Sequence, residues 1–173
     1  MQTVDHPPKR GVIHSVGELS TMSAQGHVGG GDVLIREVDR ATFDAGLFDL
    51  LAQLRPGLTR DLFEELTTVG YDQGLRFLVA EDVDGVPTAA AGYRVLSTSR
   101  GRILYVDDLV TSEAHRSRGF ASRMLAELRS RSRTGDCVRL ELDSGVTNTR
   151  AHRFYLRERL DIGAFHFAMP VDD

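Results

Sequence analysis

Three residues, Arg116, Arg118 and Gly119, lie where an apolar, strand-like stretch passes into a helical one. The first backbone N–H groups of a helix have no partner within the helix, and the helix dipole favours negative charge at that end. A glycine keeps side chains away from those groups, and arginines can add charge-assisted contacts. The pattern therefore favours binding of a phosphate or pyrophosphate. A tight turn with solvated arginines is the alternative interpretation.

Two familiar phosphate-binding patterns do not fit this stretch. A dinucleotide-binding fold needs three glycines as G-x-G-x-x-G, whereas here Gly119 is followed by Ala121 and Met124. The P-loop pattern, with Gly-Lys before Ser or Thr, is also missing from the sequence. The residues at 116–121 therefore indicate a phosphate site of another kind.

The stretch from Asn148 to Tyr155 offers a second set of polar side chains after the next predicted strand. Asn148 is a good N-cap for a helix, and Asn148, Ala151 and Tyr155 then share one helical face. A tyrosine near the end of a sheet can give a proton to a leaving group. Packing of Tyr155 in the core is the alternative interpretation.

Apolar periodicity predicts the elements that position these groups. Strands are expected at 32–38, 75–82, 86–96, 101–111, 137–143 and 164–170, and helices at 41–54, 59–70, after Gly119 and at 148–160. The final strand rests on the alternation of Phe165, Phe167 and Met169. Hairpins followed by helix crossovers predict an α/β fold, with a mixed sheet and helices on both faces.

The composition is that of an ordinary globular domain. The 173 residues are 41% hydrophobic and 27% charged, with a formal net charge of −4, so nucleic acid and membranes are not expected partners. The single cysteine, Cys137, cannot form an internal disulfide, and no apolar run approaches the ~20 residues of a membrane span. We expect a cytoplasmic protein with a flexible tail at 1–31 and one domain at 32–173.

The two polar stretches together resemble motifs of the GNAT superfamily of acyl-CoA-dependent N-acetyltransferases. The letters RSRGFA (116–121) are similar to the family's R/Q-x-x-G-x-G/A pyrophosphate motif, and NTRAHRFY (148–155) resembles its N-x-x-A-x-x-F/L-Y motif. The resemblance covers 32–170 and implies the GNAT fold, with a mixed sheet of six to seven strands. The segment 151–167 is similar to aminoalkylphosphonate N-acetyltransferases. The family often has Gly-Phe four residues after its tyrosine, where this chain has Arg159-Leu160.

The resemblance implies that acetyl-CoA is the co-substrate. In this family it lies where two parallel strands diverge, here the strands ending near Thr111 and Leu142. The residues implied to bind it are Leu109, Val110, Thr111, Arg116, Ser117, Arg118, Gly119, Phe120, Ala121, Ser122 and Asn148. A bulge is expected to turn a backbone N–H of Leu109 or Val110 toward the thioester carbonyl. No metal-binding spacing is present among the histidines and acids, so no metal is expected.

The implied reaction is acetyl transfer to a primary amine of a small molecule or a protein, by direct attack in a ternary complex. An alkyl amine has a pKa of about 10 and must lose a proton before it attacks. Asp108 is the expected base, and Asp107 acting through a water is the alternative. Strand alternation predicts that the two carboxylates point to opposite faces, so that only one reaches the cleft. Tyr155 is the expected acid for the leaving thiolate.

Two other functions stay open on the sequence alone. The chain could bind acyl-CoA as a sensor without catalysis. The six arginines within 116–133 could instead bind nucleic acid, although the negative net charge and the preceding buried strand argue against this. The residues do not identify the acceptor amine or the acyl chain. The final strand at 164–170 is suited to edge pairing in a homodimer.

Overall fold

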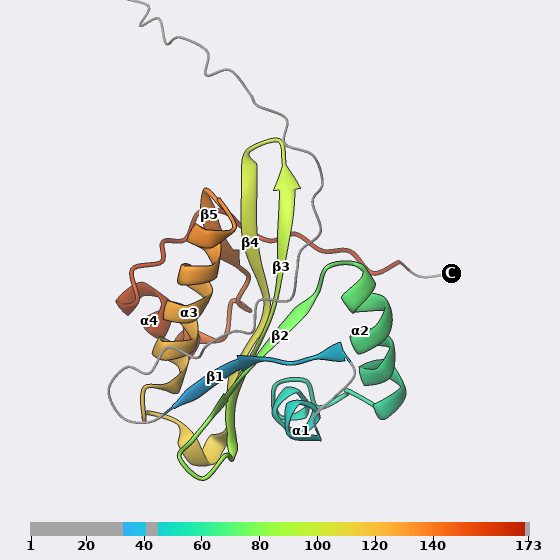
Figure 1. Cartoon of the computed structure of the whole chain (residues 1–173). Helices are drawn as coiled ribbons and strands as arrows, with labels where there is room; N and C mark the ends of the chain where they lie inside the picture. The colour runs from blue at the N-terminus through green and yellow to red at the C-terminus, as the bar shows by residue number, and fades with distance from the viewer. Residues whose placement is uncertain (1–32, 41–44, 172–173) are drawn as a thin grey trace, which may run out of the picture.

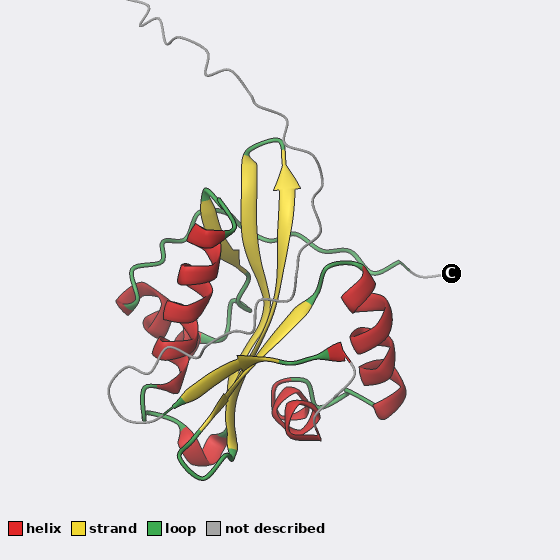
Figure 2. Cartoon of the chain, in the orientation of Figure 1, coloured by secondary structure: helices red, strands yellow, loops and turns green. Residues whose placement is uncertain are grey.

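The computed structural model describes residues 33–40 and 45–171, which form a five-stranded sheet covered by helices (Figures 1 and 2). The expected tail at 1–31 lies outside these residues. The strands are β1 (Leu34–Glu37), β2 (Arg76–Glu81), β3 (Pro87–Thr98), β4 (Gly101–Thr111) and β5 (Arg139–Leu142). The helices are α1 (Ala45–Leu54), α2 (Arg60–Asp72), α3 (Phe120–Thr134) and α4 (Thr149–Arg157), and a 3-10 turn spans Glu113–His115.

The strands lie in the sheet in the same order as in the chain, β1-β2-β3-β4-β5. The first four pair in antiparallel fashion, and β4 and β5 are parallel. Figure 1 shows α1 and α2 on one side of the sheet and α3 and α4 on the other. The parallel pair requires a crossover, which α3 provides. The predicted mixed sheet with helices on both faces is confirmed.

Alternation along β2 divides the core into two clusters, one on each face of the sheet. Phe77 and Val79 point toward α1 and α2, where they pack in one cluster with Leu51. Leu78 points the other way and packs in a cluster with Met124 of α3. Both faces of the sheet are therefore buried by helices, which holds β4 between two hydrophobic layers.

One predicted strand is absent, because residues 158–171 after α4 form no strand. The side chains of Phe165, Phe167 and Met169 are 81%, 90% and 83% exposed. The described sheet therefore has five strands instead of the expected six to seven. Alternating apolar residues form a strand only against a partner edge, and β5, with four residues, offers few hydrogen bonds. The segment leads away from α4 to the C-terminus in Figure 1.

Helix α4 ends in a tight, fully hydrogen-bonded turn at the position where the family often has glycine. The N–H of Leu160 donates to the carbonyl of Tyr155 at 3.0 Å, and that of Arg159 donates to Leu156 at 3.1 Å. This is a Schellman pattern, which needs a left-handed residue. Arg159 supplies it with a φ of 67°, so the turn forms without glycine but at a conformational cost.

Candidate functional site

Strands β4 and β5 diverge after a short parallel pairing. Their register begins at Ile103 opposite Arg139 and ends at Val106 opposite Leu142. Strand β4 continues to Thr111, so residues 107–111 extend beyond the described pairing with β5. A backbone edge of this kind can pair with an extended ligand as it would with another strand. The expected divergence of the two parallel strands is thus present.

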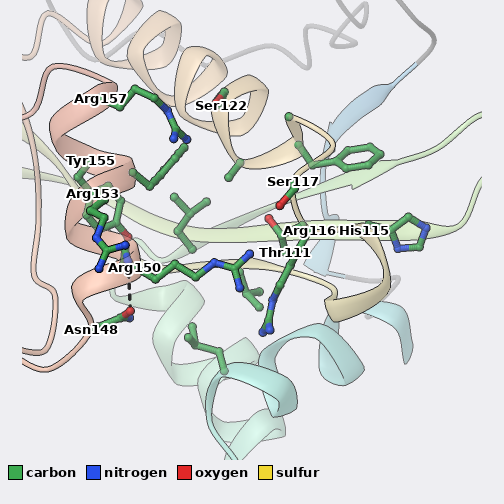
Figure 3. Close-up of a pocket in the computed structure, with 18 residues that line it drawn as sticks. Thr111, His115, Arg116, Ser117, Ser122, Asn148, Arg150, Arg153, Tyr155 and Arg157 are labelled. Atoms are coloured by element: carbon green, nitrogen blue, oxygen red, sulfur yellow. Dashed lines mark hydrogen bonds between the residues drawn. The ribbon is translucent and has the colours of Figure 1, made fainter.

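A pocket of about 610 Å³ opens beside this divergence, between the end of β4, the loop before α3, and α4 (Figure 3). Most of the residues that the sequence indicated lie around it. They are Leu109, Val110, Thr111, Arg116, Ser117, Gly119, Phe120, Ala121, Ser122 and Asn148, together with Tyr155. Arg118 and Asp108 do not line the pocket.

The start of α3 is left open by Gly119. This residue is the N-cap, has a φ of 84° and makes no side-chain capping hydrogen bond. A Cβ added at Gly119 would meet no atom within 4 Å, so there is free space in front of the helix. Within the described residues, Gly119 therefore leaves the first N–H groups of α3 without a side-chain cap from the N-cap position. This arrangement fits a phosphate group.

The two arginines of the loop have different positions. Arg116 lines the pocket and forms an ion pair with Glu113, with 3.0 Å between Nη1 and Oε1. The guanidinium of Arg118 lies 5.7 Å from the ring centroid of Phe120 and outside the pocket. Only Arg116 of this pair is therefore brought to the proposed phosphate position. Its ion pair is exposed, so its partner can be exchanged for a ligand at small cost.

Tyr155 lies on the α4 side of the pocket. Burial raises the pKa of its hydroxyl above the ordinary value, so the group keeps its proton at neutral pH and can act as an acid. No hydrogen bond to this hydroxyl is present among the described residues. The helix that carries it starts as predicted, because Asn148 Oδ1 accepts the N–H of Ala151 at 3.2 Å. Asn148, Ala151 and Tyr155 all line the pocket, as their shared helical face implied.

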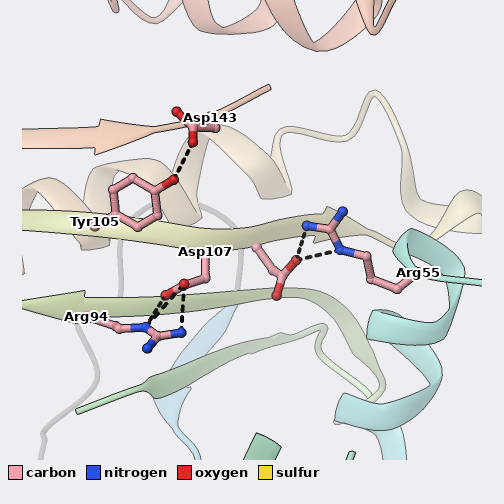
Figure 4. Close-up of polar contacts among 6 residues, drawn as sticks. Arg55, Arg94, Tyr105, Asp107 and Asp143 are labelled. Atoms are coloured by element: carbon pink, nitrogen blue, oxygen red, sulfur yellow. Dashed lines mark hydrogen bonds and ion pairs between the residues drawn. The ribbon is translucent and has the colours of Figure 1, made fainter. Parts of the chain in front are cut away.

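The two carboxylates of β4 are both held by arginines (Figure 4). Arg94 donates three hydrogen bonds to Asp107, at 3.0 to 3.2 Å, and engages both of its oxygens. Arg55, the residue after α1, donates from Nε and Nη2 to Oδ1 of Asp108 at 3.1 and 2.9 Å. Oδ2 of Asp108 has no partner among the described residues. Asp108 therefore has a carboxylate oxygen available, and Asp107 does not.

The expectation that these carboxylates point to opposite faces is wrong. Gly92 pairs with Asp108 and Tyr93 with Val106, so Asp107 is an extra residue in a β-bulge. Gly92 faces the α1–α2 layer, because a Cβ there would lie 2.9 Å from Phe77. Asp108, opposite Gly92, faces the same layer, and Asp107 turns to this face to meet Arg94. A bulge interrupts the two-residue period.

The bulge also differs in place from the expected one. The sequence interpretation put a freed backbone N–H at Leu109 or Val110, whereas the irregularity lies between Val106 and Asp108. Leu109 and Val110 pair regularly with Ala91 and Ala90 of β3. The bulge nevertheless starts where the pairing with β5 ends. It therefore contributes to the divergence of β4 from β5.

Sequence reasoning missed four pocket residues that carry basic groups. Arg150, Arg153 and Arg157 come from α4, and His115 comes from the 3-10 turn. The three arginines are spaced by three and four residues, which places them on neighbouring positions of one helix side. This spacing beside Tyr155 was a readable signal. His115 packs edge-on against Phe120, with 5.9 Å between ring centroids, and gave no comparable pattern.

The described part of the chain contains no candidate metal cluster and no candidate membrane-spanning helix. Within residues 33–40 and 45–171, no group of three or more His, Cys, Asp or Glu side chains could hold a metal ion. In the same part of the chain, no helix has the length and apolar character needed to cross a bilayer.

Comparison with known proteins shows a match to one protein family. Residues 43–160 match the sequence model described as the acetyltransferase (GNAT) family. No curated protein matches the chain at a significant level.

Solved structures share the fold at low sequence identity. The aminoglycoside N-acetyltransferase AAC(6')-Iy in complex with CoA has a TM-score of 0.72 and 16% identity, over 83% of this chain and 97% of that one. Glucosamine-6-phosphate N-acetyltransferase from Arabidopsis thaliana has a TM-score of 0.64 and 19% identity, over 82% and 99%. Ribosomal-protein-alanine N-acetyltransferase from Brucella melitensis biovar Abortus 2308 has a TM-score of 0.69 and 18% identity, over 81% and 100%.

Proposed function

The chain belongs to the GNAT family of acetyltransferases, whose acetyl donor is acetyl-CoA, and on this premise we propose that it transfers the acetyl group directly to a primary amine in a ternary complex. The observation that carries the proposal is the pocket at the divergence of β4 and β5, which joins the open start of α3 to Tyr155. Two substrates held together there react without a covalent enzyme intermediate. Proximity supplies much of the rate in such a site.

The residues around the pocket fit the successive parts of acetyl-CoA. The backbone of residues 109–111 would pair with the extended pantetheine arm. The N–H groups at the start of α3, with Arg116, would hold the pyrophosphate. Asn148 lies at the start of α4 and would contact the arm from the other side. Each of these contacts uses a group that the fold leaves accessible.

Two groups of this chain would move protons. Tyr155 would donate its hydroxyl proton to the sulfur of the leaving thiol, because burial keeps the hydroxyl protonated. Asp108 would take a proton from the incoming ammonium, since Oδ2 is available and both oxygens of Asp107 are engaged by Arg94. Leu54, next to Arg55, lines the pocket, so the Arg55–Asp108 pair lies beside its α1 end. The amine would then approach from the α1–α2 face.

The acceptor class that we propose is a primary amine, without a narrower identity. The names of the three solved structures give an aminoglycoside, glucosamine 6-phosphate and a ribosomal-protein alanine as their acceptors. None of these names supports the narrower resemblance to aminoalkylphosphonate enzymes. These proteins are each less than 20% identical to this chain, so their acceptors do not transfer to it.

The proposal is tested by binding and turnover with purified full-length protein. Calorimetry should show micromolar binding of acetyl-CoA. Thiol release measured over a panel of polyamines, amino sugars, amino acids and protein N-termini should then identify an acceptor. Initial rates with both substrates varied should give intersecting lines, as expected for a ternary complex. Binding without thiol release for every amine would contradict the transferase proposal in favour of a sensor, and parallel lines would contradict direct transfer.

We also propose that the protein forms a homodimer through its C-terminal segment. Four alternate apolar side chains of this segment are 81% to 96% exposed, those of Phe165, Phe167, Met169 and Val171. The outer edge of β5 pairs with no other described strand. A second copy of the chain offers the same edge and the same segment, so reciprocal pairing would close a two-fold dimer. Light scattering should show a dimer for the wild type and a monomer for Phe165→Ser/Phe167→Ser. A monomeric wild type at micromolar concentration would contradict the proposal.

A further inference from the structure

The two arginine–aspartate pairs on β4 differ in how much of each pair stays accessible (Figure 4). Arg94 engages both oxygens of Asp107, and its side chain is 27% exposed. Arg55 directs Nε and Nη2 to one oxygen of Asp108, and its side chain is 61% exposed. Nη1 of Arg55 and Oδ2 of Asp108 have no partner among the described residues. The Arg55–Asp108 pair is therefore open on its cationic half and on its anionic half.

Both halves of this pair are held in place and reached by solvent. In the described part of the chain, Nδ1 of His115 is the one buried side-chain nitrogen or oxygen without a partner, so Oδ2 of Asp108 is not buried. The N–H of Arg55 donates to the carbonyl of Leu51 at 2.8 Å, and its carbonyl accepts the N–H of Leu58 at 2.9 Å. The guanidinium therefore extends from a hydrogen-bonded turn at the end of α1.

The open pair adjoins the pocket from the acceptor side. Arg55 follows Leu54 in the chain and Asp108 precedes Leu109, and both of these neighbours line the pocket. An acceptor whose amine meets Asp108 would thus have the guanidinium of Arg55 beside it. A plain alkyl amine would use the carboxylate alone and leave the free N–H donors of Arg55 to water. An amine that also carries an anionic group would form charge-assisted hydrogen bonds with both halves of the pair.

We propose that Arg55 binds an anionic group of the acceptor, so that this enzyme selects amines that carry a carboxylate or a phosphonate over amines that do not. The inference rests on the proposed function, because it assumes that the amine is acetylated beside Asp108. Arg55 would contact the acceptor away from the nitrogen that takes the acetyl group, and it would therefore determine specificity. Loss of a hydrogen bond between charged groups typically weakens binding by about 10-fold to 100-fold.

The test compares amines with and without an anionic group. Thiol release by the full-length protein is measured with alanine against alaninamide, and with 2-aminoethylphosphonate against ethylamine. The wild type should give a kcat/KM at least ~10-fold higher for the anionic member of one pair or both. Arg55→Gln should bring this ratio toward one, mainly by raising KM for the anionic member, and Arg55→Lys should retain part of it. Comparing ratios between proteins cancels the different reactivities of the amines and any general loss from a displaced Asp108.

The matched control removes an arginine of the same kind elsewhere. Arg40 is exposed, pairs with one oxygen of Asp72 at 2.7 Å and does not line the pocket, so Arg40→Gln should keep the wild-type ratio. Turnover without preference for the anionic amines, or confined to amines that lack an anionic group, would overturn the inference and leave the proposed function standing. Equal slowing of both members of each pair in Arg55→Gln would also overturn it, since Arg55 would then only position Asp108. Absence of thiol release with every amine would instead contradict the proposed function.

Discussion

Several polar groups in the framework of this protein are paired with one another, whereas the same kinds of group at some positions around the pocket have no partner among the described residues. The N-terminus of α2 is capped by Thr59, whose Oγ1 accepts the N–H of Leu62 at 3.2 Å. The N-terminus of α3 has Gly119 and no side-chain cap. Arg94 is held by Asp107, whereas Arg153 has no such partner in the described chain. The same group types therefore serve stability in one place and remain available for a ligand in the other.

Two tyrosines, one buried and one partly buried, make the same contrast. Burial raises the pKa of Tyr93 to about 12, and burial also raises the pKa of Tyr155. The hydroxyl of Tyr93 donates to Glu37 at 3.1 Å and accepts from Arg131 at 2.9 Å. The hydroxyl of Tyr155 has no partner within the described residues and faces a pocket. Because Tyr155 is only partly buried and lines the pocket, a ligand there can supply the partner that the described residues do not.

The largest expected effect comes from closing the open start of α3. Gly119→Glu would place a carboxylate where the pyrophosphate is expected, and like charges in contact cost several kcal/mol. We expect acetyl-CoA binding to weaken by roughly 100-fold or more in calorimetry. A Cβ at Gly119 meets no neighbour within 4 Å, so the substitution should not displace packed side chains.

Gly74→Glu is the matched control for that variant. Gly74 also has a positive φ, 89°, and also has free space around its Cβ position, but it follows α2 and is remote in sequence from the pocket residues. Both variants should lose about 1–2 kcal/mol of stability from the left-handed conformation. Only Gly119→Glu should lose binding. Similar loss of binding in both would mean that strain, and not charge at the phosphate position, is responsible.

The next effect in size concerns the unpartnered hydroxyl. Tyr155→Phe should lower kcat by about 100-fold, the contribution of a general acid, and leave the Kd of acetyl-CoA nearly unchanged. Because the pKa of Tyr155 is raised, the hydroxyl stays protonated to higher pH than usual. The wild-type kcat should therefore not fall from loss of this proton until pH is above about 10. Steady-state rates of the wild type and of Tyr155→Phe between about pH 6 and pH 10 measure the loss of kcat and its pH dependence.

Tyr93→Phe provides the comparison for the paired hydroxyl. It removes hydrogen bonds that hold Glu37 and Arg131, so it should cost about 1 kcal/mol of stability in denaturant unfolding. Its kcat should stay at the wild-type value. If Tyr155→Phe keeps full kcat, the thiolate takes its proton from another group, and the contrast between the two tyrosines has no catalytic meaning.

Local patterns predicted the framework well because they depend on near neighbours in the chain. Asn148 is predicted as an N-cap, and its Oδ1 accepts a backbone N–H at the start of α4. The helix predicted to begin at 59 is capped by Thr59 at the start of α2. The mixed sheet followed from hairpins in the first half and crossovers in the second. In each case the residues that decide the structure lie within a few positions of one another, or follow general rules of chain connection.

Features that depend on distant partners were predicted poorly. The segment 164–170 has the alternation of a strand, but alternation does not provide an edge to pair with, and the segment forms no strand. The bulge at Asp107 depends on how β4 fits β3, and it reversed the expected direction of one carboxylate. Arg55 reaches Asp108 across 53 positions of sequence. Such contacts are decided by tertiary packing, which the local pattern around Asp108 does not contain.

A smaller effect is expected at the capped start of α2. Thr59→Ala removes the acceptor for the N–H of Leu62 and should cost about 1 kcal/mol, a typical value for an N-cap. For a chain of this size the melting temperature would fall by about 2–4 °C. Thr59→Ser keeps the oxygen and should keep most of the stability. Neither variant should change acetyl-CoA binding; a change would mean that α2 is coupled to the pocket.

The smallest expected effect is at the C-terminus of α4, where the hydrogen-bonded turn requires an unfavourable backbone conformation of one residue. Arg159 has a φ of 67°, which glycine adopts without the steric penalty of a side chain. Arg159→Gly should raise stability by about 0.5–1 kcal/mol, after the greater flexibility of glycine in the unfolded chain is counted. Arg159→Ala keeps the penalty and should bring no gain. Equal gains in both variants would trace the effect to removal of the arginine side chain, and the hydrogen-bonded turn would then carry no measurable strain.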